Sequence, residues 1–259
     1  MPIRILKNSF GAVALFLFAL TIVVVCPIFA ICFLILPEKF APQFAHQMIT
    51  RYWARLANCC FLIRVKIQNK NYIDPKKSYV FVANHRSLLD APFFALSCNN
   101  TFRFLVKAEL AKIPLMGFIV RKLCIYVNRT DKADRNAGLE SVRKSLLDGI
   151  SVFICPEGTR NRKLEPPLLE MRDGSFRIAI ATKTPLAILT ILNAGEKLSP
   201  NHPIELTPGT IHAIWDQPID TSAMTLDDVP VLRERVRAIM TGHLLEYRKS
   251  AQDFAAKTL

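Results

Sequence analysis

The sequence has no C-x-x-C pair, although it contains seven cysteines. Zinc sites and disulfide frameworks show regular cysteine spacing, and an odd number of cysteines cannot all pair with one another. The cysteines lie mostly among apolar neighbours, at positions 26, 32, 59, 60, 98, 124 and 155. We therefore expect buried free thiols, no metal site, and a reducing, cytoplasmic compartment.

Charged residues are absent from Asn8 to Pro37, where Leu, Ile, Val, Phe and Ala fill most positions. About 20 apolar residues cross the hydrocarbon layer of a bilayer, so this segment is long enough to span it. It is too long for the apolar core of a signal peptide, and no small-residue cleavage site is evident. Because Pro27 interrupts the run, three arrangements stay open: a kinked span, a re-entrant pair of helices, and a helix lying in one leaflet.

Acidic residues are in deficit, with 21 Asp and Glu against 34 Lys and Arg. The segment up to Pro37 holds Arg4, Lys7 and no acid, so the rest of the chain carries a net charge of +11. A basic surface suits nucleic acid, anionic lipid headgroups or phosphorylated substrates. Aromatic residues do not interleave with the basic ones, and no nucleic-acid-binding module is recognisable. The apolar N-terminus therefore favours lipid and argues against nucleic acid.

The segment from Ala41 to Cys60 shows helical periodicity, with apolar residues at four-residue steps and Arg51 and Arg55 outside that stripe. The stripe comprises Phe44, Met48, Tyr52, Leu56 and Cys60. The segment is either a basic amphipathic helix lying on a membrane surface or an ordinary helix that faces the core.

We predict membrane-associated helices over residues 1–60 and an α/β domain over residues 61–259. No internal repeat, low-complexity tract or linker divides the chain further.

Short apolar segments alternate with helical ones over the remainder of the chain. The predicted strands are residues 62–68, 79–83, 101–107, 124–127, 151–155, 185–192 and 210–215. The predicted helices are residues 90–97, a short helix from 107 that ends near Pro114 and Gly117, 131–148, 174–183 and 225–250. This alternation predicts an α/β fold with a mostly parallel central sheet flanked by helices. A hydrophobic membrane helix or helix pair would precede it.

Polar clusters follow three of the predicted strands: Asn84-His85 to Asp90, Asn128-Arg129, and Glu157 to Arg160. In open α/β sheets, ligands bind beyond the carboxyl ends of parallel strands, so the three clusters would converge. A histidine can accept a proton near neutral pH, and a nearby carboxylate can orient it. Arginines on loops suit a phosphate or carboxylate. Together the clusters predict an anion-binding site beside a general base.

Asp90 has a second interpretation, because Ser87-x-x-Asp90 resembles a capping box at a helix start. If Ser87 were the N-cap, Pro92 would lie inside the helix, where its ring and its missing N–H disrupt the backbone hydrogen bonds. We therefore expect the helix to start near Asp90, with His85 in the preceding loop.

The order of these motifs resembles that of the glycerolipid acyltransferases, nearest to the bacterial-type 1-acylglycerol-3-phosphate acyltransferases. Asn84 to Asp90 is similar to their HX4D box, and Cys155 to Arg160 is similar to their PEGTR signature about 70 residues later. Arg129 matches the arginine of the second signature. Shorter similarities occur at residues 107–117, 171–176 and 184–186, so the resemblance covers roughly residues 78–193.

The resemblance implies a membrane-bound O-acyltransferase that moves a fatty acyl group from a thioester to a lysophospholipid hydroxyl. The expected reaction converts 1-acylglycerol 3-phosphate to phosphatidic acid, with acyl-CoA or acyl-carrier protein as donor and no further cofactor. His85 would be the general base and Asp90 would orient it. The implied substrate-binding residues are Arg129, Glu157, Gly158, Thr159 and Arg160, of which the two arginines would bind the acceptor's phosphate.

The sequence departs from the family pattern at positions that leave the reaction class intact. Cys155 stands where phenylalanine is usual, Asp173 replaces a residue that is often basic, and residues 187–189 lack the second proline of the fourth signature. These departures leave the identity of the acceptor open, with another lyso-lipid, such as a lyso-ornithine lipid or another lysophospholipid, as the alternative. The apolar segment and the basic surface also fit a non-catalytic membrane lipid-binding protein. We expect the active site on the cytoplasmic side, at the inner membrane if the source is bacterial. Donor, acyl length and oligomeric state stay open.

Overall fold

A computed structural model describes residues 2–37, 40–114, 116–128, 131–163 and 165–258. Its centre is a seven-stranded sheet in the order β1-β7-β6-β2-β5-β3-β4. β2 to β6 run parallel to one another, whereas β7 is antiparallel to β6 and pairs in parallel with β1. The mostly parallel sheet is thus confirmed. The strands are β1 (Ile63–Gln68), β2 (Val80–Ala83), β3 (Phe102–Lys107), β4 (Cys124–Val127), β5 (Ser151–Ile154), β6 (Leu186–Ile191) and β7 (Gly209–Trp215).

The predicted helices are present, but α9 continues to Thr258, beyond its predicted end near residue 250, and the short helix α8 was not predicted. The short helix predicted from residue 107 is the 3-10 helix η3, which ends at Lys112, before Pro114, whereas the separate helix α5, which begins at Met116, was not predicted. A proline cannot continue a helical hydrogen-bond ladder, which explains the division. The helical elements are α1 (Pro2–Ile35), α2 (Ala41–Phe44), η1 (Ala45–Thr50), α3 (Arg51–Cys60), η2 (Lys70–Tyr72), α4 (Asp90–Ser97), η3 (Ala108–Lys112), α5 (Met116–Leu123), α6 (Lys132–Leu147), α7 (Gly174–Ala181), α8 (Ala194–Lys197), η4 (Leu226–Asp228) and α9 (Val229–Thr258).

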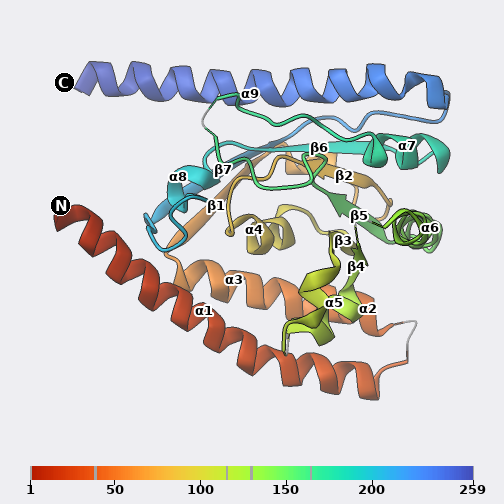
Figure 1. The fold of residues 1–259 in the computed structure, drawn as a ribbon, viewed down its shortest axis with the longest axis horizontal. Coiled ribbons are helices and arrows are strands. Elements are labelled where there is room, and N and C mark those ends of the chain that lie inside the picture. The colour runs from red at the N-terminus through yellow and green to blue at the C-terminus, as the bar shows by residue number, and fades with distance from the viewer. Residues whose placement is uncertain (1, 38–39, 115, 129–130, 164, 259) are drawn as a thin grey trace.

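Helices cover both faces of the sheet, as Figure 1 shows. α6, α7 and α9 lie on one face, while α4 lies on the other with α3 and α1 beyond it. A separate hydrophobic cluster fills each interface: along β2, Phe81 and Ala83 belong to the α4 side, and Val80 and Val82 to the opposite side. A strand buried on both faces is typical of parallel sheets and explains why β2 is apolar throughout.

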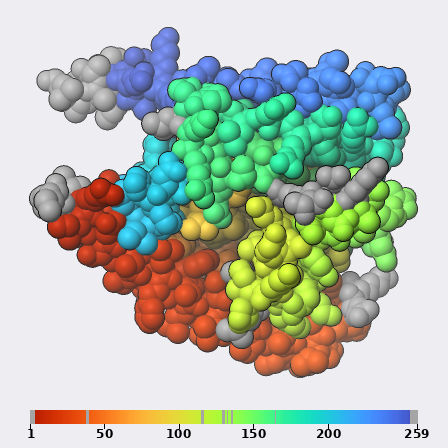
Figure 2. Space-filling model, viewed as in Figure 1, coloured from red at the N-terminus to blue at the C-terminus, as the bar shows by residue number. Residues whose placement is uncertain are grey.

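The charge-free N-terminal segment forms one continuous helix, α1, with Pro27 inside it, so it is not a re-entrant pair. α1 packs along α3, where Trp53 Nε1 donates a hydrogen bond to Thr21 Oγ1 at 3.0 Å. The Phe18 ring lies 5.6 Å from that of Trp53 and 5.1 Å from that of Phe61. Among the helices of the described residues, α1 is the one with the length and composition to cross a membrane. Figure 2 shows the N-terminal segment as an outer layer on the side away from α9.

The predicted apolar stripe on α2 and α3 faces outward rather than into the core. Phe44, Met48, Tyr52 and Leu56 are exposed, as is Phe40 four residues before them, and Cys60 is partly exposed. The small residues Ala54 and Ala57 of the same segment are buried. Many large apolar side chains of α1 are exposed as well. We call the exposed apolar residues of α1 and of residues 40–56 the apolar face. α1 packs against η1 and α3, so the two sets of exposed residues belong to neighbouring helices, and a large exposed apolar surface marks a membrane or protein contact.

Candidate active site

The carboxyl ends of β2 and β5 bring two of the three predicted clusters together. β2 pairs with β5, so the residues that follow these strands are neighbours. The His85 N–H donates to Glu157 Oε1 at 2.9 Å, and the Asn161 N–H donates to the His85 carbonyl at 2.8 Å. Arg129 of the third cluster lies outside the described residues, and Asn128 follows the edge strand β4.

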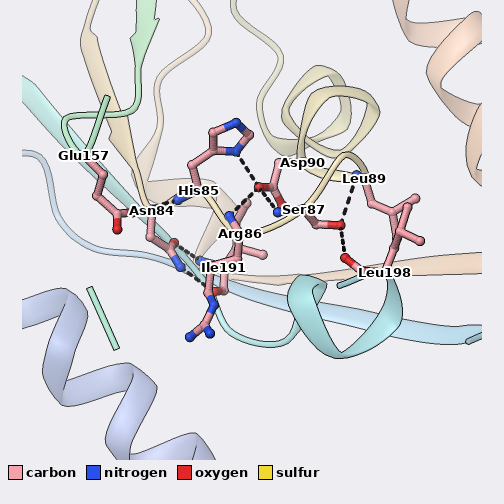
Figure 3. Close-up of polar contacts among 9 residues, drawn as sticks. All are labelled: Asn84, His85, Arg86, Ser87, Leu89, Asp90, Glu157, Ile191 and Leu198. Atoms are coloured by element: carbon pink, nitrogen blue, oxygen red, sulfur yellow. Dashed lines mark hydrogen bonds and ion pairs between the residues drawn. The ribbon is translucent and has the colours of Figure 1, made fainter. Parts of the chain in front are cut away.

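His85 and Asp90 form a close pair: His85 Nδ1 lies 2.7 Å from Asp90 Oδ2 (Figure 3). Asp90 is fully buried, and the same oxygen accepts the main-chain N–H groups of Arg86 and Ser87, each at 2.9 Å. The carboxylate is therefore fixed from three directions. Because Nδ1 faces the carboxylate, we assign it the proton, which leaves Nε2 as the nitrogen that can accept one.

The loop that carries His85 ends at Asp90, where α4 begins, as the position of Pro92 predicted. The hydrogen bond from Ser87 N–H to the Asp90 carboxylate is one half of a capping box. The other half would be a bond from Asp90 N–H to the Ser87 hydroxyl, but that hydroxyl accepts from Leu89 N–H at 3.2 Å instead. That hydroxyl also donates to the Leu198 carbonyl at 2.8 Å. Asp90 thus closes the turn before α4 and holds the imidazole at the same time.

Glu157 is buried, and both of its carboxylate oxygens bind main-chain groups. Oε1 accepts from His85 N–H, and Oε2 accepts from Leu169 N–H at 2.8 Å. Burial raises the pKa of Glu157, and these two hydrogen bonds oppose the rise. Glu157 therefore shapes the site by fixing the chain at residues 85 and 169.

Sequence reasoning assigned no role to Asn84, although it belongs to the first motif, and it missed Asn161, which directly follows the second. Asn84 joins the ends of β2 and β6: its Nδ2 donates to the Ile191 carbonyl and its Oδ1 accepts from Ile191 N–H, both at 2.8 Å. Asn161 is fully buried and holds the following loop through the Pro166 carbonyl and the Lys163 N–H, each at 2.9 Å. For Asn161, the available signal was the preference of Asn for local side chain–backbone turns, which its contact with Lys163 N–H forms. The contact of Asn84 with Ile191 joins residues far apart in the chain and had no local signal.

Two arginines at this edge have different surroundings. The Arg160 Nε is buried and has no hydrogen-bond partner among the described residues. Arg86 instead donates from Nη2 to the Lys163 carbonyl at 2.7 Å, and Figure 3 shows its guanidinium pointing away from the His85 ring. Burial, together with the nearby charge of Arg248, lowers the pKa of Arg86. Arg160 is therefore the better candidate to bind an anion.

The two residues before Arg160 were also predicted to bind substrate. Thr159 is exposed, and Gly158 has a φ of 72°, a conformation that favours glycine.

A cavity of about 320 Å³ lies behind the 155–158 loop, between α6 and α7. It is mainly apolar, and Cys155, which stands in place of the expected phenylalanine, contributes to its wall.

All seven cysteines are free thiols; Cys26, Cys32 and Cys98 are buried, but Cys59 is exposed, so the expectation of buried thiols was wrong there. Within the described ranges, no group of three His, Cys, Asp or Glu residues could hold a metal ion.

Comparisons with known proteins agree with this geometry. The Acyltransferase family profile matches residues 64–191. The 1-acyl-sn-glycerol-3-phosphate acyltransferase of Saccharomyces cerevisiae is 26% identical over 85% of this chain and 73% of its own length. A Caenorhabditis elegans protein, provisionally assigned the same activity, is 30% identical over 70% of this chain and 68% of its own. For a Chlamydomonas reinhardtii relative of that name, the match covers 60% of its length at 26% identity.

A solved structure shares the whole fold. The crystal structure of the 1-acyl-sn-glycerophosphate (LPA) acyltransferase from Thermotoga maritima superposes with a TM-score of 0.78 and 21% sequence identity. The match covers 95% of this chain and 96% of that one, so it includes the N-terminal helices as well as the sheet.

Proposed function

This chain belongs to the acyltransferase family, and from that membership we propose that it moves a fatty acyl group from an acyl thioester to the free hydroxyl of a lysophospholipid. The acceptor we propose is 1-acylglycerol 3-phosphate, which gives phosphatidic acid. One observation carries the proposal: a histidine held by a buried carboxylate at 2.7 Å, beside an arginine with an unsatisfied buried donor.

The reaction needs one base and no acyl-enzyme. His85 Nε2 removes the proton from the acceptor hydroxyl as its oxygen attacks the thioester carbonyl. The new C–O ester bond forms, the C–S bond breaks, and the imidazolium returns the proton to the departing thiolate. Asp90 keeps the imidazole oriented and stabilises its cationic form. A positioned base contributes roughly 10²–10⁴ in rate, and holding donor and acceptor together supplies much of the rest.

The choice of a phosphate-bearing acceptor rests on the arginines. We propose that Arg160 and Arg129 bind the terminal phosphate, with Gly158 and Thr159 beside it and Glu157 fixing the loop. The unsatisfied Nε of Arg160 supports this role, since a buried guanidinium donor without a partner is costly. The names of several relatives support it independently.

We place the enzyme on the membrane, with its active site on the cytoplasmic side and acyl-CoA or acyl-carrier protein as donor. The apolar face supports membrane attachment through α1 and α3. Seven free thiols support a reducing compartment.

A thioester-release assay with purified full-length protein and a panel of acceptors tests the proposal. We expect turnover with 1-acylglycerol 3-phosphate to exceed that with monoacylglycerol, which lacks the phosphate, by about 100-fold or more, because hydrogen bonds to charged groups contribute about 1.5–3 kcal/mol each. Preference for a lyso-ornithine lipid or another lysophospholipid would reassign the acceptor and leave the chemistry intact.

The thioester turnover of His85→Ala in the same assay tests whether His85 is the base. It should lose at least about 100-fold in thioester turnover, whereas His202→Ala, at an exposed histidine, should retain the wild-type rate. His85→Ala activity within tenfold of wild type, with the fold intact, would disprove the mechanism. No thiol release with any acceptor would favour a non-catalytic lipid-binding protein.

A further inference from the structure

Three cations form a group at the edge of the sheet opposite His85. Arg51 and Arg55 belong to the first turns of α3, and Lys70 lies in η2, just after β1 ends. β1 runs opposite to β2, so its carboxyl end lies at the edge where β2 begins, whereas His85 follows the carboxyl end of β2. We call Arg51, Arg55 and Lys70 the far-edge cluster.

The far-edge cluster has neutral partners in place of acids. Arg51 Nη2 donates to Asn99 Oδ1 at 2.5 Å, and Lys70 Nζ donates to the Leu96 carbonyl at 3.0 Å. In the part of the chain that the structure describes, no carboxylate forms an ion pair with any of the three. Burial and the charges of Arg51 and Arg55 lower the pKa of Lys70, as expected for like charges held close together. An anion between them would relieve that repulsion.

Unsatisfied nitrogen atoms lie at the same place. Arg51 Nε is buried without a hydrogen-bond partner among the described residues, and so are both ring nitrogens of His46. His46 precedes Arg51 by five residues, is 3% exposed, and packs edge-on against Phe102 with ring centroids 4.3 Å apart. Buried polar groups almost always have a partner, so the unsatisfied Arg51 Nε is available to donate to an anion at the cluster.

The far-edge cluster borders the apolar face. The Arg55 guanidinium lies over the ring of Tyr52, 5.3 Å from its centroid, and Tyr52 belongs to the exposed stripe of α3. If the apolar face enters the hydrocarbon boundary, cations beside it lie at the depth of the headgroups. We propose that the far-edge cluster binds the phosphate of an anionic membrane phospholipid, at a site separate from the catalytic one. This site requires the membrane attachment proposed above but not the proposed reaction.

Partition of the full-length protein into vesicles tests this site. The measured quantity is the ratio of binding to phosphatidylcholine vesicles containing phosphatidylglycerol over binding to pure phosphatidylcholine. Each cation near an anionic surface contributes about 1 kcal/mol, so Arg55→Gln/Lys70→Gln should lower this ratio by about fivefold per charge, roughly 30-fold in total. Binding to pure phosphatidylcholine should stay unchanged, because the apolar face is intact. Arg51 is left in place because its half-buried side chain also supports the fold.

Arg235→Gln/Lys249→Gln is the matched control, since it removes two exposed cations from α9 on the other side of the molecule (Figure 1). An unchanged ratio in the far-edge variant, or an equal fall in the α9 variant, would overturn the proposal. Turnover with detergent-dispersed acceptor should stay within about twofold of wild type in both variants. If wild type itself shows no turnover, the proposed function fails, while the vesicle ratio still decides this site.

Discussion

At the scale of the residue, His85 is fixed through three separate atoms. Its N–H binds Glu157, its carbonyl accepts from Asn161, and its Nδ1 faces Asp90. Two of these contacts come from the loop after β5, so the base is oriented by a segment more than 70 residues away. A base held in this way needs little reorganisation when the acceptor arrives.

Asp90→Asn should lower kcat by about 10³–10⁴-fold, as expected when the orienting carboxylate of a histidine base becomes an amide. The amide oxygen can keep the N–H groups of Arg86 and Ser87, but it carries no charge to stabilise the imidazolium that forms when His85 accepts a proton. The volume of the side chain hardly changes, so the fold should persist. Steady-state kinetics at saturating donor and acceptor, with circular dichroism, would measure both effects.

The chain contains a matched control for this substitution. Asp216 and His243 form a second Asp–His contact at 3.0 Å, between the residue after β7 and α9, away from the candidate site. Asp216→Asn should leave kcat within about twofold of wild type. Comparable losses in the two variants would mean that Asp90 acts through stability.

At the scale of the element, the π-helical turn η1 determines what the N-terminal helices bury. It joins α2 to α3 and places His46 inside, against Phe102, while Phe44 and Met48 remain outside. Burial, and secondarily the charge of Arg51, lowers the pKa of His46 to about 4.

This buried histidine predicts acid sensitivity. An unfolded histidine titrates near 6.5, so between pH 6.5 and about 4 the unfolded chain binds a proton that the folded chain does not. The contribution of His46 to stability is therefore complete above pH 6.5, and about 3 kcal/mol is lost as the pH falls to 4. Thermal unfolding between pH 7.5 and 4.5 should show this fall, and His46→Leu should flatten it.

The exposed His202 provides the control, because His202→Leu should leave the pH dependence as in wild type. An equally steep fall in His46→Leu would show that other groups, and not His46, cause the acid sensitivity. An anionic phospholipid at the far-edge cluster would stabilise the charged form of His46 and weaken the dependence.

At the scale of the whole molecule, α1 is part of the main core as well as the apolar face. Ala14 is buried in the same cluster as Phe61 and Phe81, and Phe10 and Phe18 pack against that cluster. Near its start, α1 also lies so close to the 204–206 loop that a side chain at Gly11 would collide with the Ile204 carbonyl. The boundary at residue 60, between the N-terminal helices and the α/β domain, therefore stays a prediction, which expression of the isolated α/β domain would test.

Removal of residues 1–37 should lower the melting temperature in detergent by more than about 10 °C or cause aggregation. The deletion uncovers core side chains, and each kcal/mol lost corresponds to about 2–4 °C in a chain of this size. Differential scanning fluorimetry and size-exclusion chromatography would measure the outcome. A chain ending at Ser250 is the control, since Ala251, Gln252 and Asp253 are exposed. A soluble 38–259 fragment of wild-type melting temperature would contradict this expectation.

The elements that could be predicted are those whose boundaries are marked by neighbouring residues in the sequence, such as polar turns and prolines. Every strand was located within about two residues, because short apolar segments bounded by polar turns allow few alternatives. The start of α4 followed from Pro92 alone. The division between η3 and α5 was missed, because the effect of Pro114 was treated as an end rather than as a boundary between two helices.

The sequence by itself determined the α/β class, the long apolar helix and the two motifs, because side-chain periodicity and loop chemistry are local properties. Only the tertiary structure decided that the Glu157 carboxylate reaches the His85 main chain, that Asn161 completes this support, and that α3 turns its apolar stripe outward. It also brought Lys70 beside α3, where Arg51 and Arg55 lie. These relations depend on strand order and on the direction of β1, which no single segment encodes, since sheet pairing joins residues far apart in the chain.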